Sequence, residues 1–273
     1  DDRIRRRFGE MVRKLSLTQG TSKVTRDIFP VFDAQLPPDA NEKVCVWVRD
    51  GWSIDENSVR ADARQAGNQS PTVFVFIPKR SADDLRHYLI DFKAASATLD
   101  KRGVPNTAEG TEARSAMETT KQTAEGKIRE LLQEAFSGAR VFQGGGNEVL
   151  GTDLQDMTLE AATNALQRLY PQFHIADHAG WPKVYEKAQK GAPDALKSVG
   201  DDGDPAKSPV CKAILAFIAG GKKGIDIRKN FEGANYGWPG DAVDGGLQVL
   251  LVAGLIRAQD EKGQTIDPKD LER

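Results

Sequence analysis

The chain has 273 residues, 39% of them hydrophobic and 29% charged, which is enough apolar side chain to bury a core and excludes a disordered segment. The net charge of −2 gives no support for a dedicated nucleic-acid binder, although a local basic patch is compatible with it. Two cysteines are too few for a disulfide framework, and no signal peptide or membrane-spanning apolar run is recognisable, so we expect a cytoplasmic protein without a membrane partner.

The first 16 residues are typical of a basic amphipathic helix, with Ile4, Phe8 and Val12 on one face. Its cations are Arg3, Arg5, Arg6, Arg7, Arg13 and Lys14. We interpret them as a solvated helix face rather than a nucleic-acid arm. Because the helical pattern is already under way at Asp1, we expect the chain to be a fragment of a longer protein.

Two unbroken apolar runs, 44–48 and 73–77, predict strands that are buried on both faces, as in a parallel sheet covered by helices. A helical stretch over 58–66 would cross over between them, whereas residues 17–42 look irregular. The sequence then predicts two helices, a third strand with a hairpin, and two shorter helices, at residues 81–95, 109–136, 140–150, 158–170 and 181–188. This order indicates a helix-rich α/β domain over 1–190 with a small, largely parallel sheet.

A linker rich in Gly, Pro and Asp over 191–206 leads to a predicted winged helix over 207–273, with three helices followed by a hairpin. Asp241 fits the N-cap of the third helix, and Asp244 lies in a capping-box-like position. Gly254 fits the left-handed position after that helix. Ile225, Ile227 and Phe231 are the apolar residues available for burial on the second helix, and Trp238 is interpreted as a core plug on a proline-stiffened turn.

The motifs of catalysis are missing from this sequence. An apolar strand ends near Asp50, as in a Walker B strand, but no G-x-x-x-x-G-K-[ST] loop is present to cradle phosphates. His174 and His178 are four residues apart but lack the glutamate of an H-E-x-x-H site, and neither cysteine has a histidine nearby in sequence. We therefore expect no catalytic residue, no metal and no cofactor in this chain.

DNA contact is the serious alternative. Basic residues cluster before and on the second helix of the predicted winged helix, two more lie on the wing, and one glutamine on the third helix could reach a base edge. These candidate DNA-binding residues are Lys222, Lys223, Arg228, Lys229, Gln248, Arg257 and Lys262. Asp241 and Asp244 argue against it, because carboxylates at the start of the groove-reading helix would repel phosphate.

The segment Tyr236-Gly-Trp-Pro-Gly-Asp-Ala-Val-Asp, followed by Leu-x-x-Leu-Leu and Gly254-Leu255-Ile256, resembles the P-loop proteins of the BREX phage-defence system, the BrxC and PglY group. Further segments that carry the resemblance are Val75-Phe76-Ile77-Pro78, Ala94-Ala95, Ala139-Arg140-Val141-Phe142 and Gly180-Trp181. The resemblance covers most of the chain, and none of these segments is a catalytic motif.

The resemblance implies a very large ATPase of bacterial antiviral defence whose full-length form uses ATP and Mg²⁺, with its phosphate-binding loop upstream of Asp1. The resemblance further implies that other BREX proteins are partners and that DNA is a possible partner. It also allows the full-length protein to form a homo-oligomer. We expect this chain to be a non-catalytic interaction and regulatory region of such an ATPase. The alternative is a sequence-nonspecific DNA-binding winged-helix module of a helicase-like enzyme or a transcription regulator.

Overall fold

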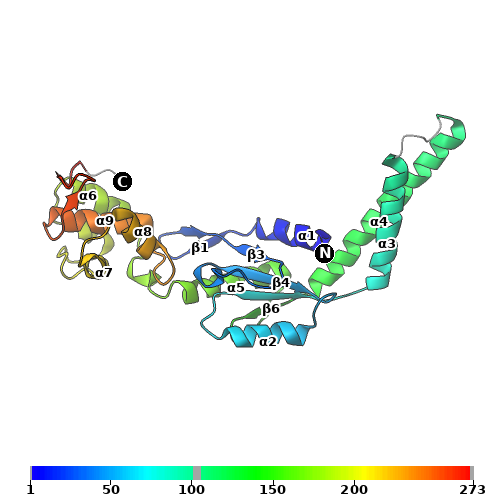
Figure 1. Cartoon of the computed structure of the whole chain (residues 1–273), viewed down its shortest axis with the longest axis horizontal. Coiled ribbons are helices and arrows are strands. Elements are labelled where there is room, and N and C mark those ends of the chain that lie inside the picture. The colour runs from blue at the N-terminus through cyan, green and yellow to red at the C-terminus, as the bar shows by residue number, and fades with distance from the viewer. Residues whose placement is uncertain (1, 101–105, 271–273) are drawn as a thin grey trace.

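The protein is mixed α/β and rich in helix, and the computed structural model describes residues 2–100 and 106–270 (Figure 1). An α/β unit lies at the centre, a helical unit at one end, and a two-helix arm projects from the other end. The sheet of the α/β unit contains β3 (Phe29–Val31), β4 (Cys45–Asp50), β5 (Val73–Ile77), β6 (Arg140–Gln143) and β7 (Glu148–Val149), in that spatial order. Its helices are α1 (Asp2–Val12), α2 (Glu56–Ala66), α3 (Ala82–Asp100), α4 (Ala108–Ser137) and α5 (Leu154–Leu169).

The two apolar runs form β4 and β5, which pair in parallel and are joined by α2, as the sequence predicted. All five residues of β5 are buried, because successive side chains alternate between two covered faces. Val73, Val75 and Ile77 belong to the core cluster that includes residues of α1 and α5, while Phe74 and Phe76 pack with Val59 and Ala63 of α2. The result is a sheet sandwiched between helices.

The sheet is mixed, so the expectation of a largely parallel sheet holds only for β3, β4 and β5. Strands β5 and β6 are antiparallel, as are β6 and β7. The physical reason is the path of the chain between them: α3 leaves the sheet and α4 returns to it, so that β6 starts at the end where β5 stopped (Figure 1). The expected turn between β6 and β7 is confirmed.

The stretch 17–42, expected to be irregular, contains three short strands. Strand β1 (Leu17–Gln19) pairs with β2 (Val24–Arg26) in an antiparallel hairpin, and β3 adds a parallel edge strand to β4. A short 3-10 helix, η1 (Ala40–Glu42), follows. Each of these strands is only three residues long, and Pro30 lies inside β3, a residue that a strand tolerates at a sheet edge.

Helices α3 and α4 pack against each other as a long antiparallel arm that leaves the α/β unit (Figure 1). Its base is anchored by Ile128, Leu132 and Phe136, all in the core cluster of the α/β unit. Further out, every residue from 111 to 123 is exposed except Met117 and Lys121, which are half-buried. The outer part of the arm therefore presents a long polar surface to its surroundings.

The helical unit comprises α6 (Trp181–Gln189), α7 (Pro209–Ile218), α8 (Gly224–Glu232), α9 (Gly240–Val252) and an antiparallel pair of β8 (Ala258–Gln259) and β9 (Thr265–Ile266). Two 3-10 helices, η2 (Phe173–Ile175) and η3 (Ala195–Val199), lie before and after α6. The second core cluster includes Ala176, Trp181 and Leu196 as well as residues of α7, α8 and α9. The boundaries 1–190, 191–206 and 207–273 stay a prediction, and residues 271–273 lie outside the described residues.

Helix α9, the third helix of the predicted winged helix, ends as expected but starts differently. Pro239 is its N-cap residue and Gly240 its first residue, so the expected capping role of Asp241 and Asp244 is wrong. Its end is a Schellman motif: the N–H of Leu255 donates to Leu250 O and that of Gly254 to Leu251 O, both at 3.0 Å, with Gly254 at φ +69°. On α8, Ile227 and Phe231 are buried, whereas Ile225 is 73% exposed, which corrects the expectation of its burial.

Polar contacts join the two units. Trp238 Nε1–H donates to Gln172 O over 2.9 Å, and the guanidinium of Arg26 stacks on Tyr170, 4.3 Å from the ring centre, and donates to Gly237 O. The carboxylate of Asp177 accepts hydrogen bonds from the backbone N–H groups of Thr21 (2.9 Å) and Ser22 (2.8 Å) at the β1–β2 turn. The contact between the hairpin and the segment before α6 is therefore charge-assisted.

We predict that Asp177→Asn weakens this contact in a pH-dependent way. Burial raises the pKa of Asp177, but the hydrogen bonds from Ser22 and Thr21 outweigh it and hold the pKa below the ordinary value. A lowered pKa stabilises the fold above the unfolded-state value of about 4, and this contribution disappears as the pH falls through the folded-state pKa. Melting temperatures of the wild type and Asp177→Asn should therefore differ at pH 7 and converge as the pH falls through the folded-state pKa of Asp177. A constant difference across that range would contradict this role for the carboxylate.

Candidate interaction surfaces

Three of the predicted DNA-binding residues are lysines that lie before or on α8. Lys222 and Lys223 precede the helix, Lys229 lies on it, and all three side chains are exposed. Within the described part of the chain none of them forms an ion pair, although the ammonium group of Lys222 lies 5.4 Å from the ring centre of Phe217. We call these three residues the α8 lysine cluster. It is available to an anionic ligand.

Arg228 is engaged inside the protein. Its Nε and Nη2 both lie 2.9 Å from Asp244 Oδ1, which joins α8 to α9. Burial raises the pKa of the neighbouring Glu232, a shift that Arg228 opposes and Asp244 reinforces. The charge of Arg228 is thus already balanced by carboxylates of its own unit. Asp244 serves as the ion-pair partner of Arg228 rather than as a helix cap.

Gln248 is fully buried and not a surface residue. Its Nε2 donates to Pro268 O over 2.7 Å and so holds the segment after β9 against α9. Its position is structural, because a side chain at 0% exposure does not face an external base edge. The prediction of base contact rested on the position of Gln248 along the helix. That position does not reveal that the segment after β9 covers the face of α9 on which Gln248 lies.

Arg257 and Lys262 are exposed around the β8–β9 hairpin. Asp260 and Glu261 share this turn, and Asp260 accepts hydrogen bonds from the backbone N–H groups of Lys262 (2.9 Å) and Gln264 (2.8 Å). Charges of both signs are therefore interspersed at the hairpin. The sequence-predicted residues do not come together as one continuous positive face.

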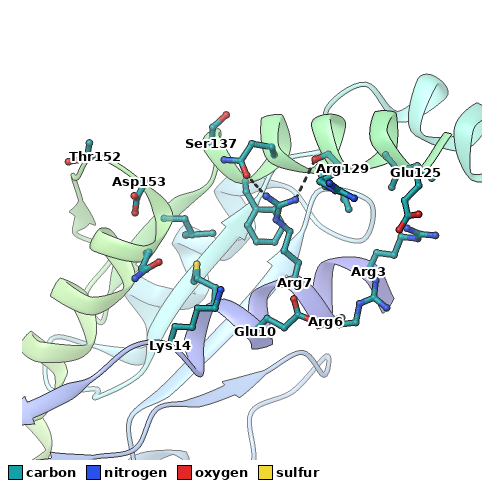
Figure 2. Close-up of a pocket in the computed structure, with 17 residues that line it drawn as sticks. Arg3, Arg6, Arg7, Glu10, Lys14, Glu125, Arg129, Ser137, Thr152 and Asp153 are labelled. Atoms are coloured by element: carbon teal, nitrogen blue, oxygen red, sulfur yellow. Dashed lines mark hydrogen bonds between the residues drawn. The ribbon is translucent and has the colours of Figure 1, made fainter. Parts of the chain in front are cut away.

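A groove of about 570 Å³ lies elsewhere, between α1, α4 and the start of α5 (Figure 2). Its cations are Arg3, Arg6, Arg7, Lys14 and Arg129, and its acids are Glu10, Glu125 and Asp153. Apolar side chains, among them Ile128 and Phe136, form part of its lining. We call this site the α1–α4 groove. Sequence reasoning treated its arginines as a solvated helix face, because nothing local shows that a helix more than a hundred residues later lies opposite them.

Two of the histidines form local backbone contacts, and both cysteines are buried. His178 Nδ1 accepts a hydrogen bond from Gly180 N–H over 2.9 Å, and His174 Nδ1 lies 3.0 Å from Pro171 O. Among residues 2–100 and 106–270, no group of three or more His, Cys, Asp or Glu side chains is arranged to hold a metal ion. Both cysteines are buried, and burial raises the pKa of Cys211 to about 11, which disfavours its thiolate.

Comparison with known proteins gave no match: no family model, no curated protein and no solved structure is similar to this chain. A separate finding concerns membranes: no helix of the described residues combines the length and apolar character that crossing a bilayer requires.

Proposed function

We propose that this chain is a non-catalytic interaction and regulatory region of a large BREX-like defence ATPase, and that it assembles with other proteins of that system. The observation that carries the proposal is the α3–α4 arm, which extends away from both cores and exposes nearly all of its outer residues. Helix α4 alone has 30 residues, about 45 Å at 1.5 Å per residue. An arm of this length reaches a partner without disturbing the sheet that anchors it.

The energetics of the arm support a binding role. Most helices in proteins are stabilised by packing of an apolar face, and two helices that bury little are marginal by themselves. In α3, Ala95 is the residue that is fully buried, while Leu85, Tyr88, Leu89 and Phe92 are only partly covered. A partner that covers the outer arm would add the missing burial. The resemblance to BREX ATPases supplies the class of partner.

The helical unit supports the same proposal. Within this unit, the order α7, α8, α9 and the β8–β9 pair suits a winged helix over 207–273, and we propose that this part is one. Arg228 is paired with Asp244, Asp241 lies in the first turn of α9, and the hairpin mixes both charge signs. Mixed surfaces of this kind suit protein partners better than a phosphate backbone.

Copurification with the other BREX proteins tests this proposal. The informative variant replaces residues 97–122 with a short Gly-Ser turn and keeps the inner part of the arm, including the buried Ala95 of α3 and Ala124 of α4. We expect the wild type to retain at least one BREX component on an affinity column and the shortened variant to lose it. A control that exchanges the exposed charges of α6, Lys183→Glu with Glu186→Lys, should bind like the wild type. Equal retention by the shortened variant would contradict the proposal, as would ATP hydrolysis by the purified chain.

A second candidate function is sequence-nonspecific DNA binding, favoured by the α8 lysine cluster. If its three lysines each neutralise one phosphate, the affinity for duplex DNA should fall roughly fortyfold between 50 and 200 mM salt, from a slope of about −0.9 per contact. Lys222→Glu with Lys223→Glu should abolish that binding in fluorescence anisotropy. Unchanged affinity of the double variant would remove α8 as a DNA contact.

A further inference from the structure

The positive charge of the chain is concentrated beside the α1–α4 groove. Residues 2–14 contain six cations and two carboxylates, a net charge of +4. Because the whole chain has a net charge of −2, the remaining residues together have a net charge of −6. The cations at the groove, Arg3, Arg6, Arg7 and Lys14, are spaced by three, one and seven residues and so share one side of α1 and its extension. Arg129 faces them from α4 (Figure 2).

Two of these arginines are held in place by aromatic rings rather than by carboxylates. The guanidinium of Arg3 lies 4.7 Å from the ring centre of Phe92, and that of Arg7 lies 5.2 Å from that of Phe136. Arg7 also donates to Gln133 Oε1 and to the backbone O of Arg129 (Figure 2). A guanidinium fixed on a ring loses less conformational entropy when it binds an anion.

Within the described part of the chain, no ion pair involves any of the five groove cations. Other arginines do find acids: Arg140 pairs with Glu148, and Arg60 pairs with the same glutamate. Of the three acids at the groove, Asp153 is the N-cap of α5 and accepts the N–H of Asp156 over 2.9 Å. The groove thus keeps an excess of positive charge that a bound anion would neutralise.

We propose that the α1–α4 groove is a binding site for a phosphate-bearing ligand, whose phosphate oxygens would meet Arg6, Lys14 and Arg129 while Arg3 and Arg7 supply the oriented guanidinium groups. Phosphate suits these donors because guanidinium groups bind it through paired hydrogen bonds. The volume of about 570 Å³ is that of a small-molecule site, for which roughly 300–1,000 Å³ is usual. The apolar lining from Ile128, Leu132 and Phe136 would cover the ester-linked part of the ligand.

This site is separate from both the outer arm and the α8 lysine cluster, so its test does not depend on the proposed function. The test uses two probes. Inorganic tripolyphosphate is titrated into the whole chain by calorimetry, and a labelled single-stranded oligonucleotide is followed by fluorescence anisotropy. We expect saturable binding of tripolyphosphate that Arg6→Glu with Arg129→Glu weakens at least about tenfold. Both residues are exposed, so the fold should tolerate the change, and the neutral pair Arg6→Gln with Arg129→Gln should weaken binding by less.

The matched control is Lys190→Glu with Lys197→Glu, which reverses two exposed cations outside the groove and should bind like the wild type. An oligonucleotide that binds more tightly than tripolyphosphate and loses affinity in the groove variant would identify the source of phosphate as nucleic acid. The reverse order of affinities would identify a small phosphorylated molecule. The proposal is overturned if neither probe binds saturably, if the groove variants bind like the wild type, or if a glutamate-rich peptide binds this groove more tightly than both phosphate probes.

Discussion

Trp238→Ala is expected to lower the free energy of unfolding of the helical unit by about 3–5 kcal/mol. The side chain of Trp238 is 1% exposed and stacks on Phe231, with ring centres 4.7 Å apart and planes at 13°. Tyr236 packs edge-on against it at 5.1 Å. Truncation would leave a cavity inside this aromatic group and would also remove the donor of the hydrogen bond to Gln172 O.

Urea unfolding followed by circular dichroism measures this loss. Trp238→Phe keeps a stacked ring but no N–H donor, so we expect it to cost less than Trp238→Ala. Trp52→Ala is the matched control, because Trp52 is 37% exposed and its loss should change stability by no more than about 0.5 kcal/mol. Equal unfolding curves for Trp238→Ala and Trp52→Ala would show that the Tyr-Gly-Trp-Pro segment is not part of the core.

Phe8→Ala is expected to destabilise the docking of α1 by about 3–5 kcal/mol. Phe8 is 0% exposed, and its ring meets that of Phe32 edge-on, with centres 6.0 Å apart. Helix α1 contributes Ile4, Phe8 and Val12 to the core cluster of the α/β unit, so Phe8 supplies the largest part of its attachment. Without that attachment the arginines of α1 would no longer face α4.

Backbone hydrogen exchange resolves this effect by segment. In Phe8→Ala we expect the amides of α1 to exchange much faster than in the wild type, while those of β5 stay protected because both faces of β5 remain covered. Arg13→Ala, at an exposed position just after the same helix, should leave α1 protected. Protection of α1 in Phe8→Ala equal to that in the wild type would contradict the packing described for this helix.

The sequence predicts best those elements whose burial is complete. Strands β4 and β5 were recognisable because covering both faces demands unbroken apolar runs, and the end of α9 because a left-handed residue after a helix favours glycine. The inward face of α1 followed from helical spacing alone. In each case the signal is contained in a few neighbouring residues.

The sequence predicts poorly what depends on distant partners. Strand β3 is short and partly exposed, and it exists because β4 pairs with it; the direction of β6 is set by the return of α4. Arg228 lies on α8 and Asp244 on α9, so their pairing could not be predicted from either helix alone. The α1–α4 groove joins the first helix to residues after 120, which is why its arginines looked like a solvated face.

Hydrogen exchange of this chain in the presence of proteins of the BREX system, the partners proposed above, tests the central claim most directly. The account predicts that a BREX component slows the exchange of amides over 111–123 of α4, the exposed outer part of the arm, while residues 222–229 stay unchanged. The opposite result would be unchanged exchange over 111–123 with every component, together with slowed exchange over 222–229 when duplex DNA is added. That outcome would replace protein assembly by DNA binding as the function of this region.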